Sequence, residues 1–261
     1  MPNDETHPER VGRYYDEWTQ RYQASFGNTL QACRPTDTAD LHRYLCDKAG
    51  VQDGERILDA GCGVCGPAIS FATYKDVTID AVTVSKAQVE AARRLVAEAG
   101  LSRRIKVHLA DFRKLHELFP EATFDRVLFL ESLSHATDPT EPLRSVFHVL
   151  KPGGIVYIKD FFERSYDDAD KQQLVREVVE RVDREFVLKT PRIQHTVDVL
   201  KRIGFREQHV GPVGFVNDVT IWVKFNQAHK FDLFGGGEPF EWSEWLELRF
   251  QKPLRLDGAA A

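Results

Sequence analysis

The sequence has little cysteine, no excess of basic residues and no long apolar run. Four cysteines in 261 residues are too few for a disulfide scaffold of this size and are typical of a reducing compartment. The formal net charge of −5 argues against a nucleic-acid partner, because binding to a phosphate backbone normally requires a basic surface. The first residues are polar, and no apolar stretch reaches membrane-spanning length. We therefore expect a cytoplasmic protein with no membrane span.

One pair of cysteines is closely spaced, Cys62 and Cys65. A zinc site would need two further soft ligands, and Cys33 and Cys46 lie in a region of helical pattern at a spacing unlike that of a metal knuckle. Both residues of the pair also fall inside a glycine-rich loop, which we interpret below as a binding loop for an organic cofactor. We therefore expect no metal site here.

The middle of the chain alternates short β-rich runs with helical patterns. Hydrophobic residues make up 42% and charged residues 29% of the chain, which is ordinary for one globular domain. From Arg56 onward the runs are RILDA, TIDAVTV, IKVHLA, FDRVLFL and GIVYIKDFF, and helical segments such as VEAARRLVAEAG end at glycine. This alternation predicts an α/β fold with a doubly wound, mostly parallel sheet, which binds ligands beyond the carboxyl ends of its strands.

Two regions lie outside this alternation. Residues 1–50 contain helical patterns with aromatic residues at helical spacing, and residues 211–241 are rich in aromatic residues and contain three consecutive glycines. We interpret the first as a helical N-terminal cap and the second as a lid insert, around a cofactor-binding core at 51–210 and before a final strand and tail at 242–261. The alternative for the rings of the cap is that they only pack its helices on the core.

The segment ILDAGCGVCGPA places Asp59 at the end of a strand and Gly61, Gly63 and Gly66 in the turn that opens a helix. The glycines allow a ligand to approach the backbone closely, and the helix start presents unpaired amides. A carboxylate directly before the turn would repel a pyrophosphate, but it can accept hydrogen bonds from a cationic amino group. This difference favours S-adenosylmethionine over a nicotinamide dinucleotide.

The sequence resembles class I S-adenosylmethionine-dependent methyltransferases, and among them the sterol and tocopherol C-methyltransferases. The resemblance is carried by YYDEWTQRYQASFG, the glycine loop, AVTVSKAQVEAA, LADF, LESLSHATDP and LKPGG, and it is continuous over residues 14–151. It implies a Rossmann-like, seven-stranded sheet and transfer of a methyl group to a small, apolar acceptor. Each motif is weak singly, but together they are specific.

The resemblance also implies a set of cofactor-binding residues. Beside Asp59 and the glycines, Thr83 and Gln88 are expected near the ribose, and Asp111 and Phe112 near the adenine. The alternative for Asp111 is a cap at a strand end. Cys65 stands where the family usually has glycine, so a side chain there would narrow the approach to the methionine portion.

In the C-methyltransferases that the chain resembles, an alkene attacks the methyl group and an acidic residue then removes a proton. By this resemblance Glu131 is the expected base, His135 an orienting residue or alternative base, and Asp138 a structural partner of the turn. The alternative for Glu131 is a polar strand end that contacts only the cofactor.

Aromatic rings attract positive charge without attacking it, which suits both a sulfonium and a carbocation. We expect Tyr14, Tyr15 and Trp18 of the cap and Trp222 of the insert to line the acceptor pocket. Three alternatives remain open. The first is methylation of a natural-product hydroxyl, with a histidine as base; the second is a non-catalytic cofactor-binding subunit; the third is a nicotinamide oxidoreductase, whose usual constellations are missing from the sequence. The candidate histidines for the first alternative are His135, His195 and His209.

If the acceptor is a prenyl diphosphate, the site also needs basic residues or a divalent ion such as Mg²⁺. The candidates for diphosphate binding are Arg34, Lys159, Arg164 and Arg192. The sequence does not predict the oligomeric state.

Overall fold

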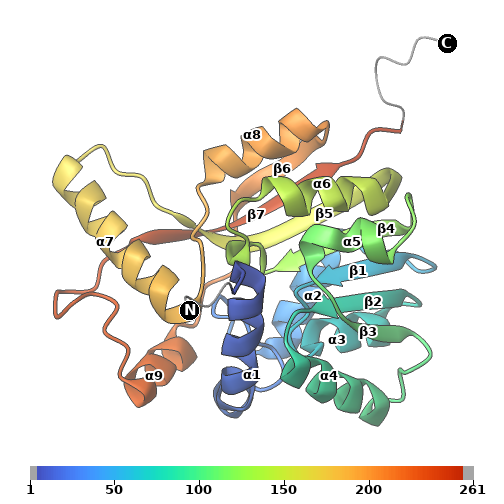
Figure 1. Cartoon of the computed structure of the whole chain (residues 1–261), viewed down its shortest axis with the longest axis horizontal. Helices are drawn as coiled ribbons and strands as arrows, with labels where there is room; N and C mark the ends of the chain where they lie inside the picture. The colour runs from blue at the N-terminus through green and yellow to red at the C-terminus, as the bar shows by residue number, and fades with distance from the viewer. Residues whose placement is uncertain (1–4, 255–261) are drawn as a thin grey trace.

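A computed structural model describes residues 5–254; residues 1–4 of the expected cap and 255–261 of the expected tail lie outside the described residues. The described chain forms a seven-stranded sheet in the order β3-β2-β1-β4-β5-β7-β6 (Figure 1). Its strands are β1 (Arg56–Ala60), β2 (Thr78–Thr83), β3 (Ile105–Leu109), β4 (Phe124–Leu130), β5 (Leu150–Glu163), β6 (Arg206–Pro212) and β7 (Ser243–Gln251).

Nine α-helices occur among residues 5–254. They are α1 (His7–Phe26), α2 (Thr38–Ala49), α3 (Gly66–Tyr74), α4 (Lys86–Glu98), α5 (Leu115–Leu118), α6 (Thr140–Val149), α7 (Ala169–Phe186), α8 (Ile193–Ile203) and α9 (Thr220–His229). Two short 3₁₀ turns, η1 (Phe112–Lys114) and η2 (Leu133–His135), follow β3 and β4.

Both faces of the sheet are covered by helices, as the alternating pattern predicts. One apolar core packs α2, α3 and α4 on the sheet, and a second packs α5, α6 and α8 on the opposite face (Figure 1). Strands β1 to β5 pair in parallel. The prediction of a doubly wound, mostly parallel sheet is confirmed.

Strand β7 runs antiparallel to both of its neighbours, β5 and β6. Its first residues therefore lie at the same edge of the sheet as the carboxyl ends of the parallel strands. Trp245 pairs with Phe161 and Ser243 with Glu163, so the start of β7 lies beside the end of β5. Two chain segments far apart in sequence thus meet at the ligand-binding edge.

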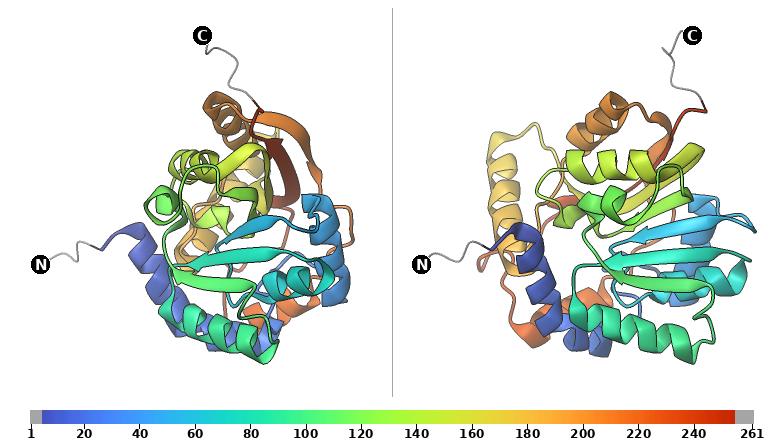
Figure 2. Two further views of the ribbon diagram at one scale, coloured as in Figure 1. Left: turned by 90° about the vertical axis from the view of Figure 1, so that its right-hand side faces the viewer. Right: turned by 45° about the vertical axis from the view of Figure 1, so that its right-hand side comes forward.

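Helices α1, α7 and α9 gather at this edge and form an aromatic cluster outside the sheet (Figure 2). Helix α1 is fixed to the core by Asp16, whose carboxylate accepts hydrogen bonds from the Ser85 hydroxyl at 2.7 Å and the Ala87 amide at 2.9 Å. Gly12 allows this approach, because a Cβ there would lie 2.7 Å from the carbonyl oxygen of Val84. Asp16 thus accepts hydrogen bonds from the start of α4. These bonds fix the position of the N-terminal helix α1 relative to the sheet.

None of the helices within residues 5–254 combines the length and the apolar character needed to cross a membrane.

Candidate active site

A cavity opens at the carboxyl ends of β1 and β4, beside the glycine loop. Asp59, Gly61, Gly63 and Gln88, all four predicted from the sequence, line it. Gly61 has φ +90°, and a Cβ there would lie 2.4 Å from Cβ of Ser132. The loop after β1 can therefore approach the loop after β4 only because residue 61 is glycine.

Asp59 is the charged group at the floor of this cavity. Its side chain is 2% exposed, and no donor within residues 5–254 hydrogen-bonds to its carboxylate. Burial raises the pKa of Asp59 to about 7. A buried carboxyl group without a partner destabilises the empty protein, and a cationic group in the cavity would relieve this cost. The site thus fits the amino end of S-adenosylmethionine.

The cysteine pair of the loop contributes one wall residue. Cys62 lines the cavity, whereas Cys65 is fully buried in the core beside α2 and α3 with a positive φ of 68°. The Cys65 side chain therefore points away from the space it was expected to narrow. Among the described residues, no group of three His, Cys, Asp or Glu side chains could hold a metal ion.

The other predicted cofactor residues lie close by but do not line the cavity. The Thr83 hydroxyl donates to Gln88 Oε1 at 2.6 Å, so Thr83 orients the glutamine. Asp111 caps η1 through the Arg113 amide at 2.9 Å and pairs with the Arg113 guanidinium at 2.7 Å. Phe112 packs edge-on against Phe129 with ring centroids 5.4 Å apart. Their contacts with adenine and ribose stay predictions.

Sequence reasoning missed the wall that the α1–α2 loop supplies. Asn28, Leu30 and Gln31 line the cavity beside the glycine loop, called the cofactor cavity below. Gly66 packs tightly against this loop, because a Cβ at residue 66 would lie 2.0 Å from the backbone carbonyl oxygen of Asn28. The motifs gave no signal for this loop. The reason that residue 66 must be glycine is its contact with the α1–α2 loop, which lies far away in the sequence.

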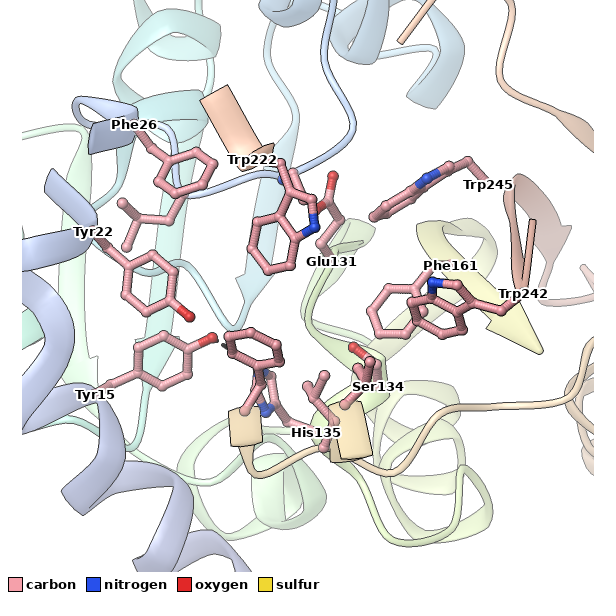
Figure 3. A pocket seen from close by; sticks show the side chains of 15 residues that line it. Tyr15, Tyr22, Phe26, Glu131, Ser134, His135, Phe161, Trp222, Trp242 and Trp245 are labelled. Carbon is pink, nitrogen blue, oxygen red and sulfur yellow. Dashed lines mark hydrogen bonds between the residues drawn. The ribbon is translucent and has the colours of Figure 1, made fainter. Parts of the chain in front are cut away.

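A second, larger cavity, called the acceptor cavity below, adjoins the first. Figure 3 shows side chains of α1 on one side, Phe161 and Trp242 on the other, and Glu131 and His135 between them. Eight of its fifteen lining residues are aromatic. They are Tyr15, Tyr22, Phe26, Phe161, Phe186, Trp222, Trp242 and Trp245. Tyr15, Leu30, Glu131 and His135 line both cavities and therefore mark the junction.

Glu131 is held by three partners at this junction. It forms a buried ion pair with Lys159 of β5, and its carboxylate accepts the Ala32 amide at 2.7 Å and the Cys33 amide at 3.2 Å. Its φ of +59°, unusual for a non-glycine residue, turns the chain at the end of β4. Lys159 also donates to Gln31 and to the Cys33 carbonyl, so the ion pair fastens the α1–α2 loop over the cofactor cavity.

His135 is buried in a single tautomer. Its Nδ1 lies 3.1 Å from the Val187 carbonyl, which can only accept, so Nδ1 carries the proton and Nε2 accepts the Tyr15 hydroxyl at 2.9 Å. Burial lowers the pKa of His135 to about 4 and raises that of Tyr15 above its usual value. Both groups are therefore neutral near pH 7.

Of the four rings expected around the acceptor, the structure brings Tyr15 and Trp222 to the cavity but not the other two. Tyr14 hydrogen-bonds to Tyr22 at 2.8 Å, and Trp18 packs against Phe231 of the insert at 5.5 Å. Tyr14 thus contacts other rings of α1, and Trp18 joins the cap to the insert; both rings pack within the aromatic cluster outside the sheet.

Two of the three candidate histidines, His195 and His209, and all four cationic candidates line neither cavity. His195 pairs with Asp138 at 3.2 Å, His209 with Glu247 at 3.5 Å, and Asp138 accepts the Thr140 amide at 2.8 Å, in keeping with its expected role in the turn. The cationic candidates also have partners: Arg164 pairs with Glu241, Arg192 with Glu163, Lys159 with Glu131, and Arg34 donates to the Phe26 and Thr29 carbonyls. No Lys or Arg within the described part of the chain lines the acceptor cavity.

Comparison with known proteins adds three findings. The mycolic acid cyclopropane synthetase family matches residues 18–228. The sterol 24-C-methyltransferase of Aspergillus fumigatus is 27% identical over 84% of this chain and 62% of its own length. The 27-O-demethylrifamycin SV methyltransferase of Amycolatopsis mediterranei is 33% identical over 59% of each chain. The chain thus spans less than two thirds of the length of these curated relatives.

Among solved structures, geranyl diphosphate C-methyltransferase from Streptomyces coelicolor, in complex with Mg²⁺, geranyl diphosphate and S-adenosyl-L-homocysteine, has the same fold. The TM-score is 0.70 at 12% identity, over 97% of this chain and 100% of that chain. The seven-stranded, Rossmann-like architecture expected from the sequence is confirmed.

Proposed function

Because the chain belongs to the mycolic acid cyclopropane synthetase family, we propose that it transfers the methyl group of S-adenosylmethionine to a carbon of an uncharged isoprenoid alkene. The observation that carries this proposal is the aromatic cavity that adjoins the glycine loop, whose lining among the described residues includes neither lysine nor arginine. Asp59 and the loop glycines would hold the cofactor, which supplies an electrophilic methyl group when bound. The junction residues then align the acceptor and exclude water.

The absence of lysine and arginine from the described lining favours an uncharged acceptor. The Streptomyces coelicolor neighbour is a geranyl diphosphate enzyme in complex with Mg²⁺. A diphosphate group would need cationic partners or a metal here, and the described lining residues include neither Lys nor Arg nor a metal-ligating cluster. We therefore expect no role for Mg²⁺.

The aromatic lining suits a reaction that passes through positive charge. When an alkene carbon bonds to the methyl carbon, the sulfur keeps the electron pair of the broken bond and the neighbouring alkene carbon becomes cationic. The ring faces of Tyr22, Phe161 and Trp245 can stabilise this cation without reacting. A proton on the adjacent carbon then passes to Glu131, and its C–H electrons form the new double bond. A weak base suffices, because such a proton is very acidic.

A second candidate, O-methylation, is favoured by the neutral His135. Its Nε2 lone pair accepts the Tyr15 hydroxyl at the junction of the two cavities. An acceptor hydroxyl that replaced this phenol could give its proton to Nε2. The similarity to the rifamycin O-methyltransferase supports the same chemistry.

The site of the new methyl group separates the two candidates. We expect methyl-labelled S-adenosylmethionine, incubated with a panel of isoprenoid alkenes, phenols and sugars, to yield a product with its labelled carbon bonded to carbon. Nuclear magnetic resonance of the product identifies the bonded atom. A label found only on oxygen contradicts carbon methylation, and no labelled product with any acceptor contradicts the methyltransferase proposal.

Proteolysis of the insert, residues 211–241, should slow when S-adenosylmethionine and the acceptor are both bound. Trp222 of α9 forms part of the cavity wall, so outward movement of the insert would widen the entrance for the acceptor. At ligand concentrations of ten times Kd, trypsin cleavage after the exposed Lys224 and Lys230 should slow about tenfold, since the ligands bind the closed form. Cleavage after exposed Arg103, far from the cavity, is the control. Equal slowing at all three residues would contradict local closure.

A further inference from the structure

One hydroxyl in the acceptor cavity has a buried carboxylate behind it. Ser134, on η2, is 1% exposed and lines the acceptor cavity. Asp160 of β5 is fully buried beside it and accepts the Ser134 amide at 3.0 Å and the Phe161 amide at 2.9 Å. The Ser134 hydroxyl lies close enough to the Asp160 carboxylate to lower the pKa of Asp160. The reaction proposed above makes no use of this pair.

The position of Ser134 is tightly fixed. Its amide is bound by Asp160, and its carbonyl accepts the Lys189 amide at 2.7 Å. A hydroxyl group held in this way loses little conformational entropy when it binds a ligand. Figure 3 shows Ser134 next to Phe161 and Trp242.

The carboxylate decides which ligand group this serine can bind. Burial raises the pKa of Asp160 to about 7, so above that pH the group is mainly an ionised acceptor. The Ser134 hydroxyl can then donate its proton toward Asp160, which leaves the Oγ lone pairs to accept a hydrogen bond from a ligand in the cavity. A matching ligand group must donate a hydrogen bond, as a hydroxyl does and an ether or ketone does not.

Resting on the proposed function, we propose that Ser134 and Asp160 form a subsite for a hydroxyl group, so that the acceptor is an apolar alcohol anchored by its oxygen. Ser134 lines the acceptor cavity but not the cofactor cavity, unlike Glu131 and His135. The hydroxyl bound there is therefore an anchor, set apart from the atom that receives the methyl group. Ser134 determines specificity and takes no part in the proton transfer.

Binding of matched probes to the full chain tests this subsite at pH 8. The probes are farnesol, its methyl ether, and the hydrocarbon in which hydrogen replaces the hydroxyl. Three tryptophans line the cavity, so quenching of tryptophan fluorescence in the presence of S-adenosylhomocysteine reports binding without turnover. We expect the wild-type protein to bind farnesol about tenfold more tightly than the ether or hydrocarbon, as one hydrogen bond allows.

Ser134→Ala should bind all three probes with the affinity that the wild-type protein has for the hydrocarbon. Ser145→Ala, which removes a buried hydroxyl outside both cavities, should keep the preference and so controls for a general loss of packing. Equal wild-type affinity for farnesol and its ether, or equal weakening of every probe by Ser134→Ala, would overturn the subsite but leave the proposed function standing. Failure of every probe to bind would overturn the subsite and the proposed apolar acceptor together.

Discussion

Glu131→Gln should lower kcat on the true acceptor by about a hundredfold or more, because glutamine keeps the shape of the side chain but cannot accept the proton. His135→Ala should be less damaging in carbon methylation, since the imidazole only orients Tyr15. Methylation of a hydroxyl requires the opposite order of the two variants. Steady-state kinetics of both variants, with cofactor affinity measured by calorimetry, gives the comparison.

The buried ion pair complicates the single substitution and also offers its control. Glu131→Gln leaves the ammonium of Lys159, which is 0% exposed, without an anionic partner, at a cost of about 3–5 kcal/mol. The double variant Glu131→Gln/Lys159→Met removes both charges, and the methionine would lie near the rings of Phe215 and Trp245. If Glu131 is the base, the double variant regains stability but stays slow. Recovery of activity in the double variant would mean that Glu131 acts only as the counter-ion of Lys159 and not as the base.

Affinity for S-adenosylmethionine should increase as the pH rises toward 7. Burial raises the pKa of Asp59 to about 7, and a cationic amino group binds the ionised form. Below that pH, binding must first remove the proton, so Kd should rise up to tenfold for each pH unit between about 7 and 5. Calorimetry between pH 5 and 7.5, where the amino group of the cofactor stays largely protonated, measures the slope.

Asp59→Asn should abolish this slope and weaken binding of S-adenosylmethionine at pH 7.5 by about tenfold to a hundredfold, the range for a hydrogen bond to a charged group.

The same substitution should stabilise the cofactor-free protein at high pH. Because the folded-state pKa lies above the ordinary value of 3.8, the stability that the protonated carboxyl contributes is lost as pH rises from about 4 to 7. Asp59→Asn should thus raise Tm at pH 8. Asp47→Asn, on the exposed face of α2, should change neither quantity, and an unchanged slope in Asp59→Asn would refute the assignment.

The glycine-loop part of the cofactor cavity was predictable because its residues lie within one short segment of sequence. The strand before the glycine loop, the turn and the helix start are consecutive, so Asp59, Gly61 and Gly63 identify one another. The doubly wound sheet followed in the same way, since each strand and each helix carries its own periodic pattern.

The acceptor side depends on long-range pairing, which no local pattern reveals. Tyr14 and Tyr15 are adjacent in sequence, but they point in different directions because a helix turns about 100° per residue. The sequence pattern alone does not say which of the two rings faces the cavity. Trp242 and Trp245 reach the cavity because β7 is antiparallel, a direction that its own residues do not specify. Lys159 did carry a signal. A lysine inside an apolar strand run must be paired, and its partner Glu131 ends the neighbouring strand.

Eight of the fifteen residues that line the acceptor cavity lie in segments 15–32 and 222–245, nearer the two ends of the chain, whereas the glycine loop follows β1. During synthesis, the segments that bind the cofactor leave the ribosome well before Trp242 and Trp245, so the acceptor cavity is completed only when β7 pairs with β5. Over evolutionary time the same separation lets substitutions in the rings of α1, α9 and β7 retune the choice of acceptor. The chemistry of methyl donation can then be inherited unchanged while the molecule that receives the methyl group is replaced.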